Sequence, residues 1–209
     1  MRQIPLDFDP TARTGPIRAA RLLSDVMSPP AAFATAGLVM SWLDRPGITG
    51  LSWGALYGSL ASLLPVLFVV YAYKTGQVSD MHMSDPRERH VPYLIGLLGA
   101  GLAWGLVRAY AAAPLLQDLV LTHIAVMLGL TAWNYFKLVS AHVASLAAIA
   151  LFAGLAVGPG AGWMLAPLVV LILIVRRYLK RHTRGELILG LFTGAAAVIV
   201  LAQIGAYAF

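Results

Sequence analysis

The feature that most constrains this chain is a succession of apolar stretches, each close to the length that crosses a membrane. A hydrocarbon core roughly 30 Å thick needs about 20 apolar residues per helical span. In lipid, every backbone N–H and C=O group must be paired inside its own segment, so these stretches are expected to be α-helices. The expected spans are about 31–45, 51–73, 92–112, 114–133, 138–157, 163–175 and 186–208.

Composition agrees with this interpretation. Hydrophobic residues make up 59% of the chain and charged residues only 11%, whereas a soluble domain has about 45–50% apolar and about 25% charged residues. The sequence therefore predicts an integral membrane protein that folds as an all-α, polytopic transmembrane helical bundle of about six to seven spans. The chain has no cysteine, which excludes disulfides, thiolate metal sites and a cysteine nucleophile.

Two regions are expected along the chain. Residues 1–30 are polar and rich in proline, with no apolar region of a signal peptide, so we interpret them as a polar tail. Within this tail, residues 17–27 alternate apolar and charged side chains and are expected to form an amphipathic helix on the membrane surface. Residues 31–209 are expected to form a single transmembrane domain that carries the catalytic site.

Positive charge is distributed unequally between the two sides of the predicted bundle. If the spans alternate in direction, every Lys and Arg except Arg45 and Arg108 falls on the side that holds the N-terminal tail. The positive-inside rule places that side in the cytoplasm.

Three polar segments also share this side. They are residues 85–92, 137–142 and 176–186. Ionisable residues at the ends of membrane helices are costly to keep there and are functional candidates. Arginine binds non-bridging phosphate oxygens through charge-assisted hydrogen bonds, one histidine can attack phosphorus, and a second can protonate the departing alkoxide. The set suits phosphoryl transfer without a metal ion or cofactor.

These segments resemble the type 2 phosphatidic acid phosphatase superfamily of integral membrane lipid phosphatases. The family pattern is K-x6-R-P, then P-S-G-H, then S-R-x5-H-x3-D. The third part is matched by Arg176, His182 and Glu186, and the second by Ser140 and His142. In the first part only the arginine is present: the sequence has Arg89 at that position, with His82 in place of the lysine and His90 in place of the proline, and Ala141 replaces the glycine of the second part.

The resemblance covers roughly residues 20–205 and implies a role for each matched residue. His182 would be the nucleophile that forms a phosphohistidine, Glu186 its orienting carboxylate, and His142 the acid for the leaving group. Arg89, Arg176 and Ser140 would bind phosphate. Arg87 and Lys137 are further candidates for this binding, because the family's lysine is missing. Residues 85–92 look like the acidic and basic loop of some bacterial and archaeal members, so we expect a bacterial or archaeal plasma membrane. The distribution of Lys and Arg places the active site on its cytoplasmic face.

The expected partners are the lipid bilayer and a phosphatidyl or polyprenyl phosphate as substrate, with no nucleic acid. The sequence leaves two alternative functions open. The chain could be a catalytically silent relative that binds anionic lipid or a partner protein, or a small transporter. Asp118, Thr122 and His123 lie within the fourth span and are interpreted as structural, forming hydrogen bonds between helices.

Overall fold

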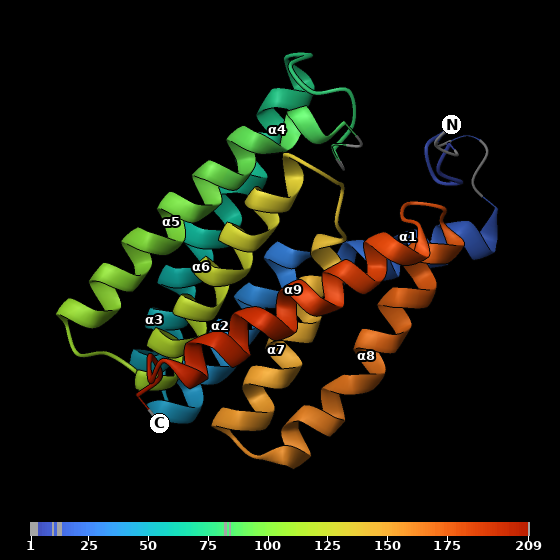
Figure 1. The fold of residues 1–209 in the computed structure, drawn as a ribbon. Coiled ribbons are helices and arrows are strands. Elements are labelled where there is room, and N and C mark those ends of the chain that lie inside the picture. The colour runs from blue at the N-terminus through green and yellow to red at the C-terminus, as the bar shows by residue number, and fades with distance from the viewer. Residues whose placement is uncertain (1–3, 10, 12–13, 82, 84, 209) are drawn as a thin grey trace.

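The computed structural model describes residues 4–208 except for 10, 12, 13, 82 and 84. Within this part of the chain every regular element is helical, as the sequence predicts (Figure 1). The α-helices are α1 (Gly15–Val26), α2 (Pro29–Asp44), α3 (Ile48–Gly58), α4 (Leu64–Lys74), α5 (His90–Ala109), α6 (Pro114–Asn134), α7 (Ala141–Ala156), α8 (Pro159–Tyr178) and α9 (Arg184–Gln203). A π-helical segment, η1 (Ser59–Leu63), joins α3 to α4, and a 3-10 helix, η2 (Pro86–Arg89), precedes α5.

Five helical stretches are long and apolar enough to cross a membrane, which is consistent with an integral membrane protein. They are Ile48–Lys74, Arg87–Ala109, Pro114–Asn134, Pro159–Tyr178 and Arg184–Gln203. A sixth is reached if α1 and α2, which meet at a 48° bend, count as one broken span. α7 is apolar but has only 16 residues, which gives it a length of about 24 Å. The all-helical prediction is therefore confirmed for the described residues, with five to six helices that could span a membrane against the six to seven spans predicted from the sequence.

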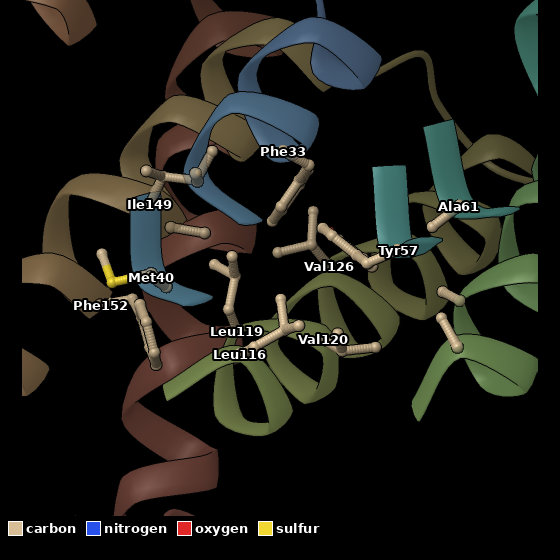
Figure 2. Close-up of a cluster of buried hydrophobic side chains, with 14 of the residues drawn as sticks. Phe33, Met40, Tyr57, Ala61, Leu116, Leu119, Val120, Val126, Ile149 and Phe152 are labelled. Carbon is tan, nitrogen blue, oxygen red and sulfur yellow. The ribbon is translucent and has the colours of Figure 1, made fainter. Parts of the chain in front are cut away.

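The hydrophobic core lies where α2, α3, α6 and α7 meet. Figure 2 shows Phe33 of α2 and Tyr57 of α3 pointing toward Val126 of α6, while Met40 of α2 points toward Phe152 of α7. α6 packs against α2, α5, α7 and α9. It therefore joins these four helices, while α8 packs on α7 and α1, and α3 packs on α2.

Part of the N-terminal segment packs on the bundle. The amide of Leu6 donates to the carbonyl of Leu179 over 3.1 Å, Asp7 is only 1% exposed, and α1 packs against α8. In Figure 1 the segment lies at the end of the bundle where α8 gives way to α9. Since α1 buries Ala20 and Ser24, its inner face meets protein. The domain boundary at residue 30 stays a prediction.

Hydrogen bonds inside the bundle confirm the structural interpretation of the polar residues in α6. His123 Nδ1 lies 2.7 Å from the hydroxyl of Tyr57 on α3. Thr122 donates to the carbonyl of Asp118, and its hydroxyl lies 2.8 Å from that of Tyr207 beyond α9. The amide of Ala208 donates to Oδ2 of Asp118 over 2.9 Å, so all three polar residues have partners outside α6, which removes most of the cost of burying them.

Two glycines on α9 allow it to approach α7 closely. A side chain at Gly190 would lie 2.8 Å from the carbonyl oxygen of Ser140, and one at Gly194 would collide with the carbonyl of Ala144. Small residues four apart are a common way for helices in lipid to pack with their backbones close together. The first turns of α7 and α9 are thereby brought side by side.

The substitution Gly194→Ala is expected to lower the thermal unfolding midpoint in detergent, because the added methyl group forces α7 and α9 apart. Overpacking of this kind costs about 1–3 kcal/mol. Gly101→Ala on α5 is the matched control, since its methyl group would meet nothing within 4 Å. Equal midpoints for the two variants would contradict the close packing of α9 on α7.

Candidate functional site

The turn between α8 and α9 folds His182 back over the end of α8. The N–H of Lys180 donates to the carbonyl of Arg177, and the N–H of Arg181 donates to that of Arg176, both over 3.1 Å. Lys180 itself is in the left-handed region at φ 55°. These two bonds form a Schellman motif, which ends a helix and reverses the chain. Residues 181 and 182 therefore return toward the last turn of α8.

The first turn of α9 fixes Glu186 beside His182. The hydroxyl of Thr183 accepts from the amide of Glu186, and Oε2 of Glu186 accepts from the amide of Thr183 over 3.0 Å, which forms a capping box. The same Oε2 lies 3.1 Å from Nδ1 of His182. Because an ionised carboxylate can only accept, Nδ1 of His182 carries the proton.

His182 is consequently a neutral imidazole with a free lone pair on Nε2. That nitrogen lies 3.3 Å from Nη2 of Arg176, and a guanidinium can only donate. Burial lowers the pKa of His182 to about 4; the hydrogen bond to Glu186 opposes this shift, and the positive charges of Arg176 and Arg89 add to it. The ring is therefore unprotonated at neutral pH.

Arg176 extends from the last turn of α8 and is 3% exposed. Its Nη1 donates to the hydroxyl of Ser24 over 3.0 Å, while its Nε is buried without a hydrogen-bond partner in the part of the chain that the structure describes. The hydroxyl of Ser140 is likewise buried without a hydrogen-bond partner among the described residues. A buried polar group without a partner costs about 1–3 kcal/mol. An anion with several acceptor oxygens is the kind of ligand that would satisfy the Nε donor of Arg176.

α7 contributes Ser140 and His142 from its first turn. The amide of Ser140 donates to the carbonyl of Glu186 over 3.2 Å, so the starts of α7 and α9 are in contact. His142 Nε2 lies 3.1 Å from the carbonyl oxygen of Ser24 and 3.4 Å from its hydroxyl. Through Ser24, the second histidine is thus connected to Arg176.

The remaining phosphate-binding candidates fall into two groups. Arg89 is buried, its Nε donates to the carbonyl of Met83, and its charge acts on His182. Arg87 and Lys137 are exposed, although Nζ of Lys137 would lie 3.8 Å from a side chain added at Gly185. The structure therefore brings Arg89 to His182 but leaves Arg87 and Lys137 at the surface. His82, which takes the place of the family's lysine, lies outside the described residues.

A buried carboxylate from the N-terminal segment neutralises two neighbouring arginines. Asp7 accepts from Nε of Arg181 over 2.8 Å and from Nη1 of Arg21 over 2.9 Å. Burial by itself raises the pKa of Asp7, but the hydrogen bonds and charges of these two arginines outweigh it and hold that pKa below its usual value. Arg89 and Arg176, in contrast, have no carboxylate partner among the residues described.

We call the set of Ser24, Arg89, Ser140, His142, Arg176, His182 and Glu186 the arginine–histidine cluster. Its excess charge is positive and lies on Arg89 and Arg176. Over the described ranges no group of three or more His, Asp or Glu residues could hold a metal ion. The cluster can therefore bind an anion and present an unprotonated histidine nitrogen next to it.

Sequence reasoning missed Ser24 and Asp7. Ser24 lies four residues after Ala20 on the buried face of α1, so a polar residue on an otherwise apolar helix face was a usable signal. Asp7 lies outside any helix, and no spacing links it to Arg181, which is 174 positions away.

The buried neutral state of His182 predicts a loss of stability in acid. Its folded pKa, about 4, is below the unfolded value of about 6.5, so the unfolded state gains a proton first as the pH falls. The free energy of unfolding should have its full value above about pH 6.5 and should decrease by on the order of 3 kcal/mol as the pH falls to about 4. Unfolding midpoints measured across this range should fall less in His182→Asn. The control is His90→Asn, which removes a ring in tilted contact with Tyr135, and it should retain the wild-type dependence.

Asp7→Asn is expected to destabilise the protein, because it leaves Arg181 buried without its closest carboxylate. Removing one partner of a buried ion pair costs about 3–5 kcal/mol. The control is Asp25→Asn, which disturbs an ion pair with Arg21 whose acidic side chain is 47% exposed and should cost about 0–1 kcal/mol. Similar unfolding midpoints for both variants would show that the N-terminal segment is not anchored by Asp7.

The residues of this cluster come from four separate parts of the chain, at residue 24, residue 89, residues 140–142 and residues 176–186.

No protein-family model matches the sequence, and neither a curated protein nor a solved structure matches it.

Proposed function

We propose that the chain is a membrane-embedded phosphohydrolase with the fold of the type 2 phosphatidic acid phosphatase superfamily, acting on a lipid phosphate through a phosphohistidine. The observation that carries the proposal is the pair of contacts on His182. Glu186 holds the Nδ1–H, and the unprotonated Nε2 faces the guanidinium of Arg176. A neutral imidazole beside a fixed cation is suited to attack an anionic phosphorus centre that the same cation binds.

Phosphate binding would use the two positive charges that no carboxylate neutralises. Arg176 offers its unpartnered Nε–H, and Arg89 adds a second buried cation close to His182. Ser140 offers a hydroxyl with no hydrogen bond to any residue that the structure describes, at the N-terminus of α7, where the helix dipole favours an anion. Together these groups would stabilise the charge that develops on the phosphoryl oxygens.

The proposed reaction has two steps. Nε2 of His182 attacks phosphorus, a P–N bond forms, and the bond from phosphorus to the lipid oxygen breaks, while His142 gives a proton to that oxygen. Water then attacks the phosphohistidine, His142 takes a proton from the water, and inorganic phosphate leaves with His182 restored. Glu186 keeps the proton on Nδ1 in the first step and stabilises the cationic ring of the intermediate.

A lipid substrate fits the surroundings of the cluster. α5, α8 and α9 expose large apolar side chains such as Leu98, Val170 and Phe192 along their lengths, so acyl or prenyl chains would lie beside them in the bilayer. The head group would then meet the cluster at the ends of α8 and α9. The charge distribution along the sequence favours a cytoplasmic position for this end. The resemblance of residues 85–92 to bacterial and archaeal members of the superfamily is the ground for proposing a plasma membrane of that kind.

The test is release of inorganic phosphate from phosphatidate and from a polyprenyl phosphate in detergent, with a chelator present. His182→Gln is expected to lose at least about 10³-fold in kcat because it removes the nucleophile. Arg176→Lys should lose about 10²-fold, since an ammonium cannot replace the planar guanidinium. Arg87→Lys, at an exposed position, is the matched control and should stay within about twofold of wild type.

A second measurement separates this mechanism from other routes to phosphate. Reaction with a substrate labelled in its phosphoryl group, quenched in alkali, should leave label on the wild-type protein that acid then releases, as a phosphohistidine does. His142→Ala should accumulate label, whereas His182→Gln should take up none. Absence of turnover in the wild type, or turnover that survives His182→Gln, would refute the proposal. Binding of phosphate without turnover would instead indicate an anionic-lipid-binding protein.

A further inference from the structure

Ser24 is the one member of the cluster that comes from the N-terminal helix. Its side chain is completely buried, on the face of α1 that packs against α8. Neither phosphate chemistry nor the packing of an amphipathic helix requires a serine at this position. The contacts of Ser24 with Arg176 and His142 indicate its role.

The hydroxyl and the carbonyl of Ser24 present two acceptors to two donors of the cluster. Nη1 of Arg176 donates to the hydroxyl over 3.0 Å. Nε2 of His142 lies 3.1 Å from the carbonyl, which can only accept, so this nitrogen carries a proton. One residue therefore fixes both the rotation of the guanidinium and the tautomer of the second histidine.

The bend between α1 and α2 is what makes the carbonyl available. In a continuous helix the amide of Ser28 would donate to the carbonyl of Ser24, four residues earlier. Here the amide of Ser28 donates to the carbonyl of Asp25 instead, and the chain turns by 48° into α2 at Pro29. The carbonyl of Ser24 is thus one of the unpaired groups at a helix C-terminus, and His142 is its partner.

We infer that Ser24 is a positioning residue of the candidate site, which orients Arg176 and His142 toward one bound phosphoryl group. The inference rests on the proposed function. Ser24 accepts from Nη1 of Arg176 and leaves Nε available for a phosphate oxygen, and its carbonyl keeps a proton on Nε2 of His142. Through these two contacts the N-terminal segment is part of the active centre.

The opposite role for Ser24 would be that of a plug, which occupies the space of the leaving oxygen until α1 moves away. The two roles predict opposite effects of removing the hydroxyl. Loss of a positioning contact slows the chemical step, whereas loss of a plug makes the site easier to enter and speeds the reaction or tightens substrate binding.

The experiment measures phosphate release from phosphatidate by the full chain in detergent, comparing wild type with Ser24→Ala. We expect kcat to fall about tenfold to a hundredfold, because misplaced catalytic groups cost this much, with KM changed less than threefold. Ser41→Ala is the matched control, since Ser41 is an equally buried serine that donates to the carbonyl of Gly37 inside α2. It should keep the wild-type kcat. Unchanged or increased kcat in Ser24→Ala overturns the inference.

A double-mutant cycle with His142→Ala distinguishes positioning from general loss of structure. If Ser24 acts through His142, Ser24→Ala should have a much smaller effect on kcat in the His142→Ala background than in wild type. Full additivity would overturn the inference. Ser24→Cys, which keeps the volume and weakens the hydrogen bonds, serves in the same cycle if Ser24→Ala unfolds.

Binding of inorganic phosphate separates failure of this inference from failure of the proposed function. If the wild-type protein shows no turnover, the proposed phosphohydrolase function is refuted but the role of Ser24 is not. The shift of the unfolding midpoint on adding inorganic phosphate then measures phosphate binding at the cluster. That shift should be smaller in Ser24→Ala than in Ser41→Ala, because Arg176 is no longer oriented. Equal shifts refute the role of Ser24.

Discussion

The close approach of α9 to α7 is the constraint on which the candidate site depends. Glycines at 190 and 194 let the backbone of α9 lie against the carbonyls of Ser140 and Ala144. This contact aligns the first turns of the two helices, so the amide of Ser140 reaches the carbonyl of Glu186. Because Glu186 in turn holds His182, one helix crossing sets the position of the serine that starts α7 and of the histidine that precedes α9.

Burying so many cations at one end of the bundle requires compensation, and the structure provides it in two ways. Asp7 neutralises Arg181 and Arg21 directly. His182 remains neutral, since burial and the nearby arginines disfavour its protonation. The uncompensated charge is therefore confined to Arg89 and Arg176, and a polyanionic ligand bound there would supply the missing negative charge. Charge balance and the proposed chemistry select the same two arginines.

The sequence predicted the parts of this arrangement that are locally encoded. Apolar stretches located the helices to within a few residues, because a span depends only on its own side chains. The spacing from Arg176 to His182 and Glu186 also predicted a real cluster, since a Schellman turn and a capping box are short-range structures. Asp7 was not predictable as a site residue, and the one signal for Ser24 was a polar residue on an otherwise apolar helix face. Their roles depend on how α1 docks on α8, a tertiary contact that no periodicity in the sequence records.

The orientation of the helix ends around the cluster explains why α1 belongs there. α7 and α9 both begin at the cluster and direct the positive ends of their dipoles toward it, where an anion is favoured. α1 ends there, so its negative end and the free carbonyl of Ser24 face His142. A donor N–H is favoured at that end, and acid catalysis requires one. Ser24, at the end of α1, thus presents its carbonyl to the proposed proton donor and its hydroxyl to the proposed phosphate-binding arginine.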